Sequence, residues 1–431
     1  MNRELLTRTL QKQARGRGMT RRQLGLAAVS LPLLHCVGSG GEAPVEVASV
    51  SDWSGLESEL QALFERSGTV GFSAGVLVEN ELVWSAGFGF ADLANERPRT
   101  PQTLQNIGSV TKTATATLIL RLVEQGLLDL DQDVQEQVDF AVRNPRFPDA
   151  PITARQLLTH RSSVLDGSAY EESYVCGDQT ESLGTFLTAY FGASESESVF
   201  HEWQPGTEDP PEDPRAYSNV GYGLLGHLAE RVTGKAYEQA LRDEVLEPLG
   251  MKHSVVRLSD LDPAAGAGFQ HAALYSRVPE DQDLTDTSDL LLADPPWPAE
   301  LKPGEFAQHC LYSFGTPPDG LLRSNVDDLA QLLRLYIGRG EVDGVRLLQE
   351  TTVVDALTPR HFGRALCWDL SSIEEGENFW NHSGGDPGVS TLIAFRPEQR
   401  SGFVLLFNDS NPGQGFGAVI ETVIGTLNEI G

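Results

Sequence analysis

The stretch Ser109-Val110-Thr111-Lys112 is the part of the sequence that says most about the fold. It opens a predicted helix, Thr111 to Gly126, whose apolar residues recur at the spacing of one helical face: Ala114, Leu118, Ile119, Leu122 and Val123. One helical turn separates the hydroxyl of Ser109 from the amine of Lys112, so both groups lie on the same face. An amine in that position can help to ionise a serine.

Two further motifs accompany this one, which alone would occur roughly 0.36 times by chance in a chain of this composition. Tyr217-Ser218-Asn219 lies just before a second predicted helix, Tyr222 to Val232. His382-Ser383-Gly384-Gly385 precedes a predicted strand, Ser390 to Phe395, so a side chain and backbone N–H groups can face a site from the edge of a sheet. Singly, these residues are typical of a helix cap, a half-buried aromatic and a surface imidazole. Together they favour a catalytic site.

The rest of the chain predicts strands near both ends and helices between them. A hairpin is expected from Phe72 to Ala86, around the turn Glu79-Asn80-Glu81. Near the C-terminus a strand from Gly402 to Asn408 follows the one at Ser390, and a helix from Phe416 to Leu427 ends the pattern. Further helices are expected at Leu56 to Leu63, Tyr237 to Leu246 and Asn325 to Ile337. This order predicts one α/β domain whose sheet is completed by the C-terminal strands.

Composition excludes several classes of protein. The 431 residues are 40% hydrophobic and 22% charged, so the chain can bury enough apolar surface to fold. Its 32 basic and 61 acidic residues give a net charge of -29, which would repel a phosphate backbone. We therefore expect no nucleic-acid partner.

The N-terminus has the layout of an export signal. Residues 1–22 carry seven basic residues and one acid, and the uncharged stretch Leu24 to Cys36 is too short to span a bilayer. Thr20 to Leu26 resembles a twin-arginine signal, with an ordinary basic signal region as the alternative. We expect a signal over residues 1–36, a flexible tether over 37–55, and a protein that is exported in a bacterium.

Cys36 decides whether the exported protein is anchored. Leu33-Leu34-His35-Cys36, followed by small residues, resembles a bacterial lipoprotein site, although His35 stands where a small residue is usual. A membrane tether through a lipidated Cys36 and a soluble periplasmic protein both stay open. The three other cysteines, with no C-x-x-C spacing, allow one bridge of undetermined pairing and indicate no metal knuckle: Cys176, Cys310 and Cys367.

The three motifs, in this order, resemble those of the serine β-lactamase-related family: class C β-lactamases, D-alanyl-D-alanine carboxypeptidases, D-aminopeptidases and related esterases. Nearly the whole mature chain takes part, since five other segments also look like that family: Trp84 to Asp92, Leu157 to His160, Tyr222 to Gly226, Pro248 to Met251 and Gly320 to Ser324. The resemblance implies a β-lactamase/transpeptidase-like fold over residues 56–431. Such a fold is α/β (α+β), with an antiparallel sheet flanked by helices and a mostly helical inserted subdomain.

The resemblance also implies catalytic roles. Ser109 would be the nucleophile, and Lys112 with Tyr217 the pair that handles its proton. The backbone N–H groups of Ser109 and Gly385 would form the oxyanion hole. The implied function is that of an exported serine hydrolase cleaving an amide or ester through an acyl-enzyme, as an esterase, D,D-peptidase or β-lactamase. The alternative is a penicillin-binding or inactive surface protein that is acylated without turnover.

Binding roles follow in the same way. Asn219 would orient the scissile amide or ester, and Ser383 and Gly384 would contact substrate. His382 stands where many penicillin-recognising members place a lysine, which weakens the case for tight capture of a carboxylate. A second departure is Arg161-Ser162-Ser163, where family members usually carry a Ser-Gly pair, so the loop geometry there is open.

No metal or cofactor is expected. The remaining histidines show neither H-E-x-x-H nor H-x-H spacing, so the sequence predicts no metal site. Gly87-Phe88-Gly89 lacks the third glycine and the βαβ context of a dinucleotide loop, and it is better read as the end of a strand.

The resemblance implies a small-molecule or peptide substrate, and charge patterning predicts the charge of that substrate. Between Arg161 and Arg215 there is no lysine or arginine, and a histidine at position 382 is mostly neutral at pH 7. If the segment borders the cleft, its negative rim favours neutral or cationic substrates; the alternative is a solvated acidic face elsewhere. Twelve acids gather in this segment: Asp166, Glu171, Glu172, Asp178, Glu181, Glu195, Glu197, Glu202, Glu208, Asp209, Glu212 and Asp213.

Overall fold

The computed structural model describes residues 53–192, 199–207, 216–262, 270–278, 304–360, 363–374, 377–410 and 412–430. The predicted signal with Cys36 and most of the predicted tether lie outside the described residues. The first described helix, α2 (Ser54–Ser67), begins before residue 56, so the last two residues assigned to the tether are helical. The cause is packing, because the ring of Trp53 already stacks on Trp84 at a centroid distance of 6.3 Å.

A seven-stranded antiparallel sheet forms the centre of the fold, in the order β12-β13-β14-β15-β1-β2-β3. Its C-terminal strand β15 pairs with β1, with Phe407 opposite Phe72, which confirms that the C-terminal strands complete the sheet. The strands are β1 (Gly71–Val78), β2 (Glu81–Asp92), β3 (Arg97–Pro98), β12 (Asp369–Glu374), β13 (Glu377–Asp386), β14 (Val389–Arg396) and β15 (Ser401–Phe407).

Three of these strands, β3, β12 and β13, were not predicted from the sequence. The motif at His382 lies inside β13 and not before a strand, which corrects the sequence-based placement. The reason is that Glu377–Asp386 is rich in polar residues and glycine and shows no apolar alternation. Pairing with β14, where Ser383 lies opposite Leu392, supplies the order that local propensity does not.

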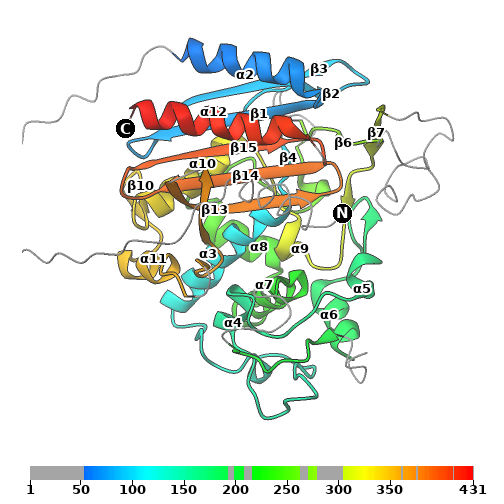
Figure 1. Cartoon of the computed structure of the whole chain (residues 1–431). Coiled ribbons are helices and arrows are strands. Elements are labelled where there is room, and N and C mark those ends of the chain that lie inside the picture. Colours follow the sequence, from blue (N-terminus) through cyan, green and yellow to red (C-terminus); the bar gives the residue numbers. More distant parts are fainter. Residues whose placement is uncertain are drawn as a thin grey trace, which may run out of the picture. The chain divides into compact units, whose positions relative to one another are not determined.

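Both faces of the sheet are covered by helices (Figure 1). Helices α2 and α12 (Gln414–Ile430) lie side by side on one face, and α10 (Val326–Ile337) packs on the other. Consecutive strand residues therefore enter different cores: Leu392 packs with the first pair of helices, and Ile393 with the second layer. At Gly75 a Cβ would lie 2.3 Å from Val326, so a glycine is required for the approach of α10.

A mostly helical region, inserted in the chain between β3 and β12, forms the second layer. Within it α3 (Thr111–Glu124) packs against α7 (Asn219–Thr233) and α9 (Pro317–Gly320). The other helical elements are η1 (Gly108–Val110), η2 (Val134–Glu136), α4 (Ala154–Leu158), α5 (Ser168–Glu171), α6 (Leu183–Gly192), α8 (Tyr237–Leu241), the π-helical turn η5 (Arg242–Leu246), η6 (Leu258–Asp260) and α11 (Glu350–Ala356). The predicted arrangement, an antiparallel sheet with flanking helices, is confirmed.

Among the described residues, four short two-stranded sheets lie outside the central sheet. They pair β4 (Gln105–Asn106) with β9 (Arg323–Ser324), β5 (Val175–Cys176) with β8 (Tyr312–Ser313), β6 (Leu274–Arg277) with β7 (Phe306–His309), and β10 (Glu341–Val342) with β11 (Val345–Arg346). In the described part of the chain, no helix has the length and apolar character needed to cross a membrane.

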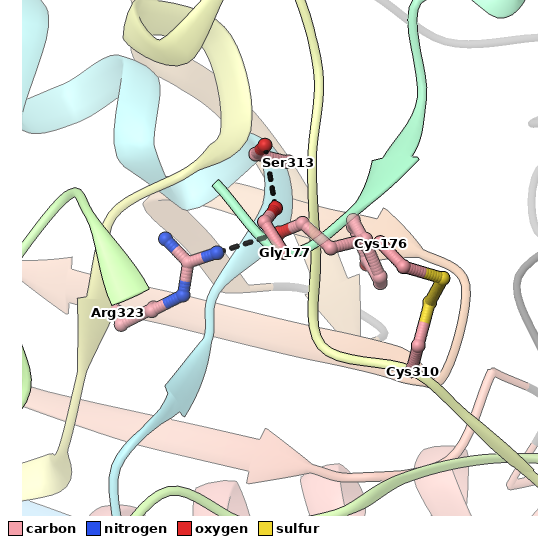
Figure 2. Close-up of a disulfide and its surroundings, with 6 residues drawn as sticks. Cys176, Gly177, Cys310, Ser313 and Arg323 are labelled. Carbon is pink, nitrogen blue, oxygen red and sulfur yellow. Dashed lines mark hydrogen bonds between the residues drawn. A yellow bond between two sulfur atoms is a disulfide. The ribbon is translucent and has the colours of Figure 1, made fainter. Parts of the chain in front are cut away.

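A disulfide joins Cys176 of β5 to Cys310, which decides the pairing that the sequence left open (Figure 2). Cys367 is free and buried. The segments that carry these two cysteines are also joined by a hydrogen bond of 2.8 Å from Ser313 Oγ to the carbonyl oxygen of Gly177. The bridge therefore fastens the β5 segment to the segment that leads into α9.

Replacing Cys176 by serine should lower the free energy of unfolding by about 2–4 kcal/mol, because the bridge closes a loop with a sequence separation of 134 residues. Denaturant unfolding with and without a reductant measures this. The Cys367→Ser protein should still lose stability when reductant is added, whereas Cys176→Ser should lose none. Equal unfolding of the wild-type protein under both conditions would contradict the prediction.

Candidate active site

Ser109 lies in η1, the tight turn that leads directly into α3. Gly108 has a φ of +54°, and its N–H donates to Asn106 Oδ1 at 2.8 Å. A Cβ at Gly108 would lie 3.1 Å from the backbone nitrogen of Gly385. The turn therefore places the hydroxyl of Ser109 at the N-terminal end of α3, close to β13, where the positive end of the helix favours a developing anion.

Lys112 is fully buried and reaches back to Ser109. Its Nζ donates to Ser109 Oγ at 3.1 Å and to Asn219 Oδ1 at 2.8 Å. Tyr217 approaches from the other side, with a hydrogen bond of 2.6 Å between its hydroxyl and Ser109 Oγ. The structure thus brings together four of the residues that the sequence singled out, from two motifs more than 100 positions apart.

The Tyr217-Ser218-Asn219 motif is held by the N-terminus of α7. Ser218 caps the helix, because its Oγ accepts from the N–H of Gly221 at 2.9 Å. Asp166 accepts from the N–H groups of Asn219 and Val220, at 2.8 and 3.0 Å. Burial raises the pKa of Asp166, and these hydrogen bonds oppose that shift. Asp166 is therefore a half-buried cap of α7 and not a fully solvated surface acid.

His160 supports the same motif and was not predicted as part of the site. Its ring stacks on the ring of Tyr217 at a centroid distance of 4.3 Å. Its Nδ1 accepts a hydrogen bond of 3.1 Å from the N–H of Ser218. The ring thus orients the phenol and ties the motif to the end of α4. The only signal in the sequence was its place in Leu157 to His160, a segment of the resemblance.

The unusual loop after His160 adopts a glycine-like conformation. Ser163 has a φ of +62°, a region that favours glycine. Its Oγ accepts a hydrogen bond of 3.1 Å from Asn144 Nδ2, and its carbonyl oxygen accepts from the N–H of His201 at 2.8 Å. These contacts hold the serine in that conformation, so the departure at Arg161-Ser162-Ser163 does not disrupt the loop.

β13 forms the opposite wall. A Cβ at Gly384 would lie 2.2 Å from the carbonyl oxygen of Ile107 and 3.2 Å from the nitrogen of Ser109, so only glycine permits this close approach. Ser383 and Gly385 are exposed, whereas His382 is buried. The Nδ1 of His382 lies 2.9 Å from the carbonyl oxygen of Ser383, which can only accept, so this nitrogen carries a proton.

Two carboxyl groups that the sequence did not indicate adjoin the site. Asp319 of α9 has Oδ2 at 3.7 Å from Lys112 Nζ, and burial raises the pKa of Asp319 to about 6. Asp386, at the end of β13, accepts from Tyr174 Oη at 2.9 Å and from Asn106 Nδ2 at 3.3 Å. Loss of solvent raises the pKa of Asp386 to about 7. Such shifts are typical of functional sites.

The predicted acidic rim is only partly within the described residues. Glu171, Glu172, Glu181 and Glu202 are exposed. Asp178 accepts from the N–H groups at positions 258 and 259, which lower its pKa. Asp166 is half-buried at the N-terminus of α7. The remaining six acids lie outside the described residues: Glu195, Glu197, Glu208, Asp209, Glu212 and Asp213.

Among the residues that the structure describes, no three His, Cys, Asp or Glu side chains gather in a way that could hold a metal ion.

Comparison with known proteins agrees with this geometry. The beta-lactamase family model matches residues 56–423. A beta-lactamase of Pseudomonas fluorescens is 26% identical over 368 residues, covering 83% of this chain and 93% of that protein. Protein flp of Staphylococcus aureus (strain MW2) is 25% identical over 334 residues, which are 77% of this chain but only 58% of that longer protein.

The fold has counterparts among solved structures. The octameric penicillin-binding protein homologue from Pyrococcus abyssi is similar with a TM-score of 0.67 and 26% identity, covering 87% of this chain and 77% of that one. The family match spans the sheet, the helical layer and all three motifs. The chain therefore belongs to the beta-lactamase family.

Proposed function

We propose that the protein is an exported serine hydrolase that cleaves an amide or an ester through a covalent acyl-enzyme. The observation that carries this proposal is the environment of Ser109 Oγ, which lies 3.1 Å from Lys112 Nζ and 2.6 Å from Tyr217 Oη. A serine with two proton-handling groups at hydrogen-bond distance is the arrangement of an activated nucleophile. Its place at the start of α3 adds the positive end of a helix.

The reaction runs in two halves. Ser109 Oγ attacks the substrate carbonyl while its proton passes to the Lys112–Tyr217 pair. The backbone N–H groups of Ser109 and Gly385 bind the oxyanion, an interaction that strengthens as charge develops. The same pair returns the proton to the leaving group, and water then releases the acyl group. Asn219 accepts from Lys112 at 2.8 Å, so it also orients the amine.

A second candidate is a penicillin-binding protein that is acylated without turnover. Similarity to a penicillin-binding protein homologue favours it. Labelling by a fluorescent phosphonate together with turnover of a p-nitrophenyl ester supports the hydrolase, whereas labelling by penicillin without product release supports the alternative. A panel of nitrocefin, p-nitrophenyl esters and D-amino-acid peptides separates β-lactamase, esterase and peptidase activities, which are decided by side chains around the cleft.

We propose that export is directed by the basic N-terminus and the uncharged stretch Leu24 to Cys36. Lipidation of Cys36 would tether the hydrolase to a membrane, and cleavage without lipidation would release it to the periplasm. Both forms leave the same catalytic domain, since the described fold begins at residue 53.

Substrates are neutral or cationic in this proposal. The carboxyl group of Asp386 adjoins the site, and His382 stands where a permanent positive charge would attract a carboxylate. We expect an uncharged short-chain ester to show a kcat/KM about tenfold or more above that of a matched ester with a free carboxylate at low salt. High salt should reduce this ratio because it screens the charges.

The pH dependence of that ratio identifies the group responsible. The pKa of Asp386 is about 7, so its charge appears as the pH rises from 6 to 8 and the preference should grow over that range. The Asp386→Asn protein should show a smaller preference that changes less between pH 7 and pH 8. Faster turnover of the carboxylate ester at low salt would contradict the prediction.

A further inference from the structure

Asp319 makes two contacts with the amine of Lys112. Its backbone carbonyl oxygen accepts from Lys112 Nζ at 2.7 Å, and its carboxylate oxygen Oδ2 lies 3.7 Å from the same nitrogen. The side chains of Lys112 and Asp319 are 0% and 3% exposed. A charge in such surroundings is strongly disfavoured unless an opposite charge accompanies it. Within the described chain, Asp319 provides the only carboxylate that forms an ion pair with Lys112.

The amine of Lys112 has three hydrogen-bond partners. Three oxygens surround Nζ at 2.7 to 3.1 Å: the carbonyl of Asp319, Oδ1 of Asn219 and Oγ of Ser109. An ammonium group has three N–H donors, one for each oxygen. A neutral amine has two, which match the carbonyl and the side-chain amide oxygen, and its lone pair can accept from the Ser109 hydroxyl. The ion pair with Asp319 is therefore the contact that favours the charged form.

The carboxylate of Asp319 is itself held in place. Thr316 Oγ1 donates to Oδ1 at 2.5 Å and Tyr170 Oη donates to Oδ2 at 3.0 Å. Both donors favour the ionised form, as does Lys112, while burial opposes it and raises the pKa of Asp319 to about 6. The carboxyl group is therefore charged above about pH 6.

The other titratable groups around the pair do not replace this carboxylate. Asp166 acts on both members, but its oxygens are engaged by the N-terminus of α7. Arg364 is the other cation among the described groups near the pair, and it forms an ion pair with Asp369 at 2.8 Å. The groups that act on Asp319, on Lys112 or on the tyrosines beside them are Asp166, Tyr170, Tyr174, Tyr217, Tyr222, Tyr237, Arg364, Cys367 and Asp386.

We propose that Asp319 is a positioning residue, the counter-ion that stabilises the charged form of the Lys112 amine beside Ser109. Its consequence for catalysis rests on the proposed function. A charged amine that donates to Ser109 Oγ at 3.1 Å stabilises the anion that forms when this hydroxyl loses its proton.

The test is a titration of Lys112 by NMR in protein labelled with ¹³C at lysine Cε. The chain has only five lysines, and comparison with a Lys112→Arg sample assigns the resonance. In Asp319→Asn the midpoint of this titration should fall by about 1 to 3 pH units, because the nearby opposite charge is lost. Asp319→Glu keeps the charge and should stay near the wild-type midpoint. An unchanged midpoint in Asp319→Asn would overturn the proposal.

Asp328→Asn is the matched control. Asp328 is also a buried carboxyl group with a raised pKa, and it accepts from Ser254 Oγ at 2.7 Å, within another set of contacts. This variant should lose thermal stability and leave the Lys112 midpoint where it was. If removing any buried carboxyl group had this effect, the Lys112 midpoint would fall equally in Asp328→Asn and in Asp319→Asn. That result would also overturn the proposal.

A measurement on the unchanged protein guards against variants that fail to fold. The Lys112 Cε resonance should shift near pH 6 as Asp319 gains its proton, and a resonance that is flat there would overturn the counter-ion role. With an ester substrate, the acid limb of the kcat/KM profile should move to lower pH in Asp319→Asn. If the wild-type protein turns over no substrate, the proposed function fails, while the NMR result still decides the role of Asp319.

Discussion

Ser109→Ala is expected to abolish covalent labelling by a phosphonate or penicillin and to lower ester turnover by about four to six orders of magnitude. The reason is that no other atom replaces Oγ as the nucleophile, whereas the backbone N–H of residue 109 and the positive end of α3 remain. The melting temperature should change little, because the side chain is partly exposed and serves chemistry more than core packing.

Intact-protein mass spectrometry after incubation with the label measures this result. Ser182→Ala is a suitable control, because Ser182 is exposed and, among the described residues, its Oγ forms side-chain hydrogen bonds with Thr185. That variant should label as the wild-type protein does. Labelling of Ser109→Ala at the wild-type rate would show that the nucleophile has been assigned to the wrong residue.

Lys112→Met and Tyr217→Phe are each expected to slow acylation by about three orders of magnitude or more, and the double variant should be little slower than either. Both groups act on the same proton of Ser109, at 3.1 and 2.6 Å from its Oγ, so losing one already breaks the path. Methionine keeps most of the buried volume of Lys112, which is fully enclosed, but it leaves the charge of Asp319 without a partner. Some loss of stability should therefore accompany that variant.

Stopped-flow acylation rates for the two single variants and the double variant provide the measurement. Tyr222→Phe serves as control, since its ring lies 5.5 Å from Lys112 Nζ but its hydroxyl donates to the carbonyl oxygen of Leu158. It should lose stability and keep its acylation rate. Strictly additive losses in the double variant would argue against a shared proton path.

Local patterns in the sequence determined much of the fold. The helix from Thr111 was predicted to Gly126 and ends at Glu124, with Gly126 at a φ of +72° as a stop signal. The hairpin of β1 and β2 and the pair β14 and β15 were predicted within a few residues, except that β2 runs on to Asp92. These predictions succeeded because burial of one face imposes a period of 3.6 or 2 residues that is visible along the chain.

The spacing of a single motif also determined part of the site. Ser109 and Lys112 are one helical turn apart, so their contact at 3.1 Å follows from helix geometry alone. The prediction that Tyr217 and the motif at His382 belong to the same site as Ser109 came from the family resemblance. No local periodicity in the sequence indicated it. Nothing in Glu377–Asp386 shows the alternation of a strand, and for that reason β13 was missed.

Only the tertiary structure decided which distant side chains meet. Asp319 lies 207 positions from Lys112, and Asp386 lies 212 positions from Tyr174. Asp166 looked like a surface acid in the sequence but caps α7, and the pairing of Cys176 with Cys310 was one of three choices. Such contacts depend on how whole helices and strands pack, and a carboxyl group carries no mark along the chain of whether its neighbours will be water, a helix N-terminus or a buried lysine.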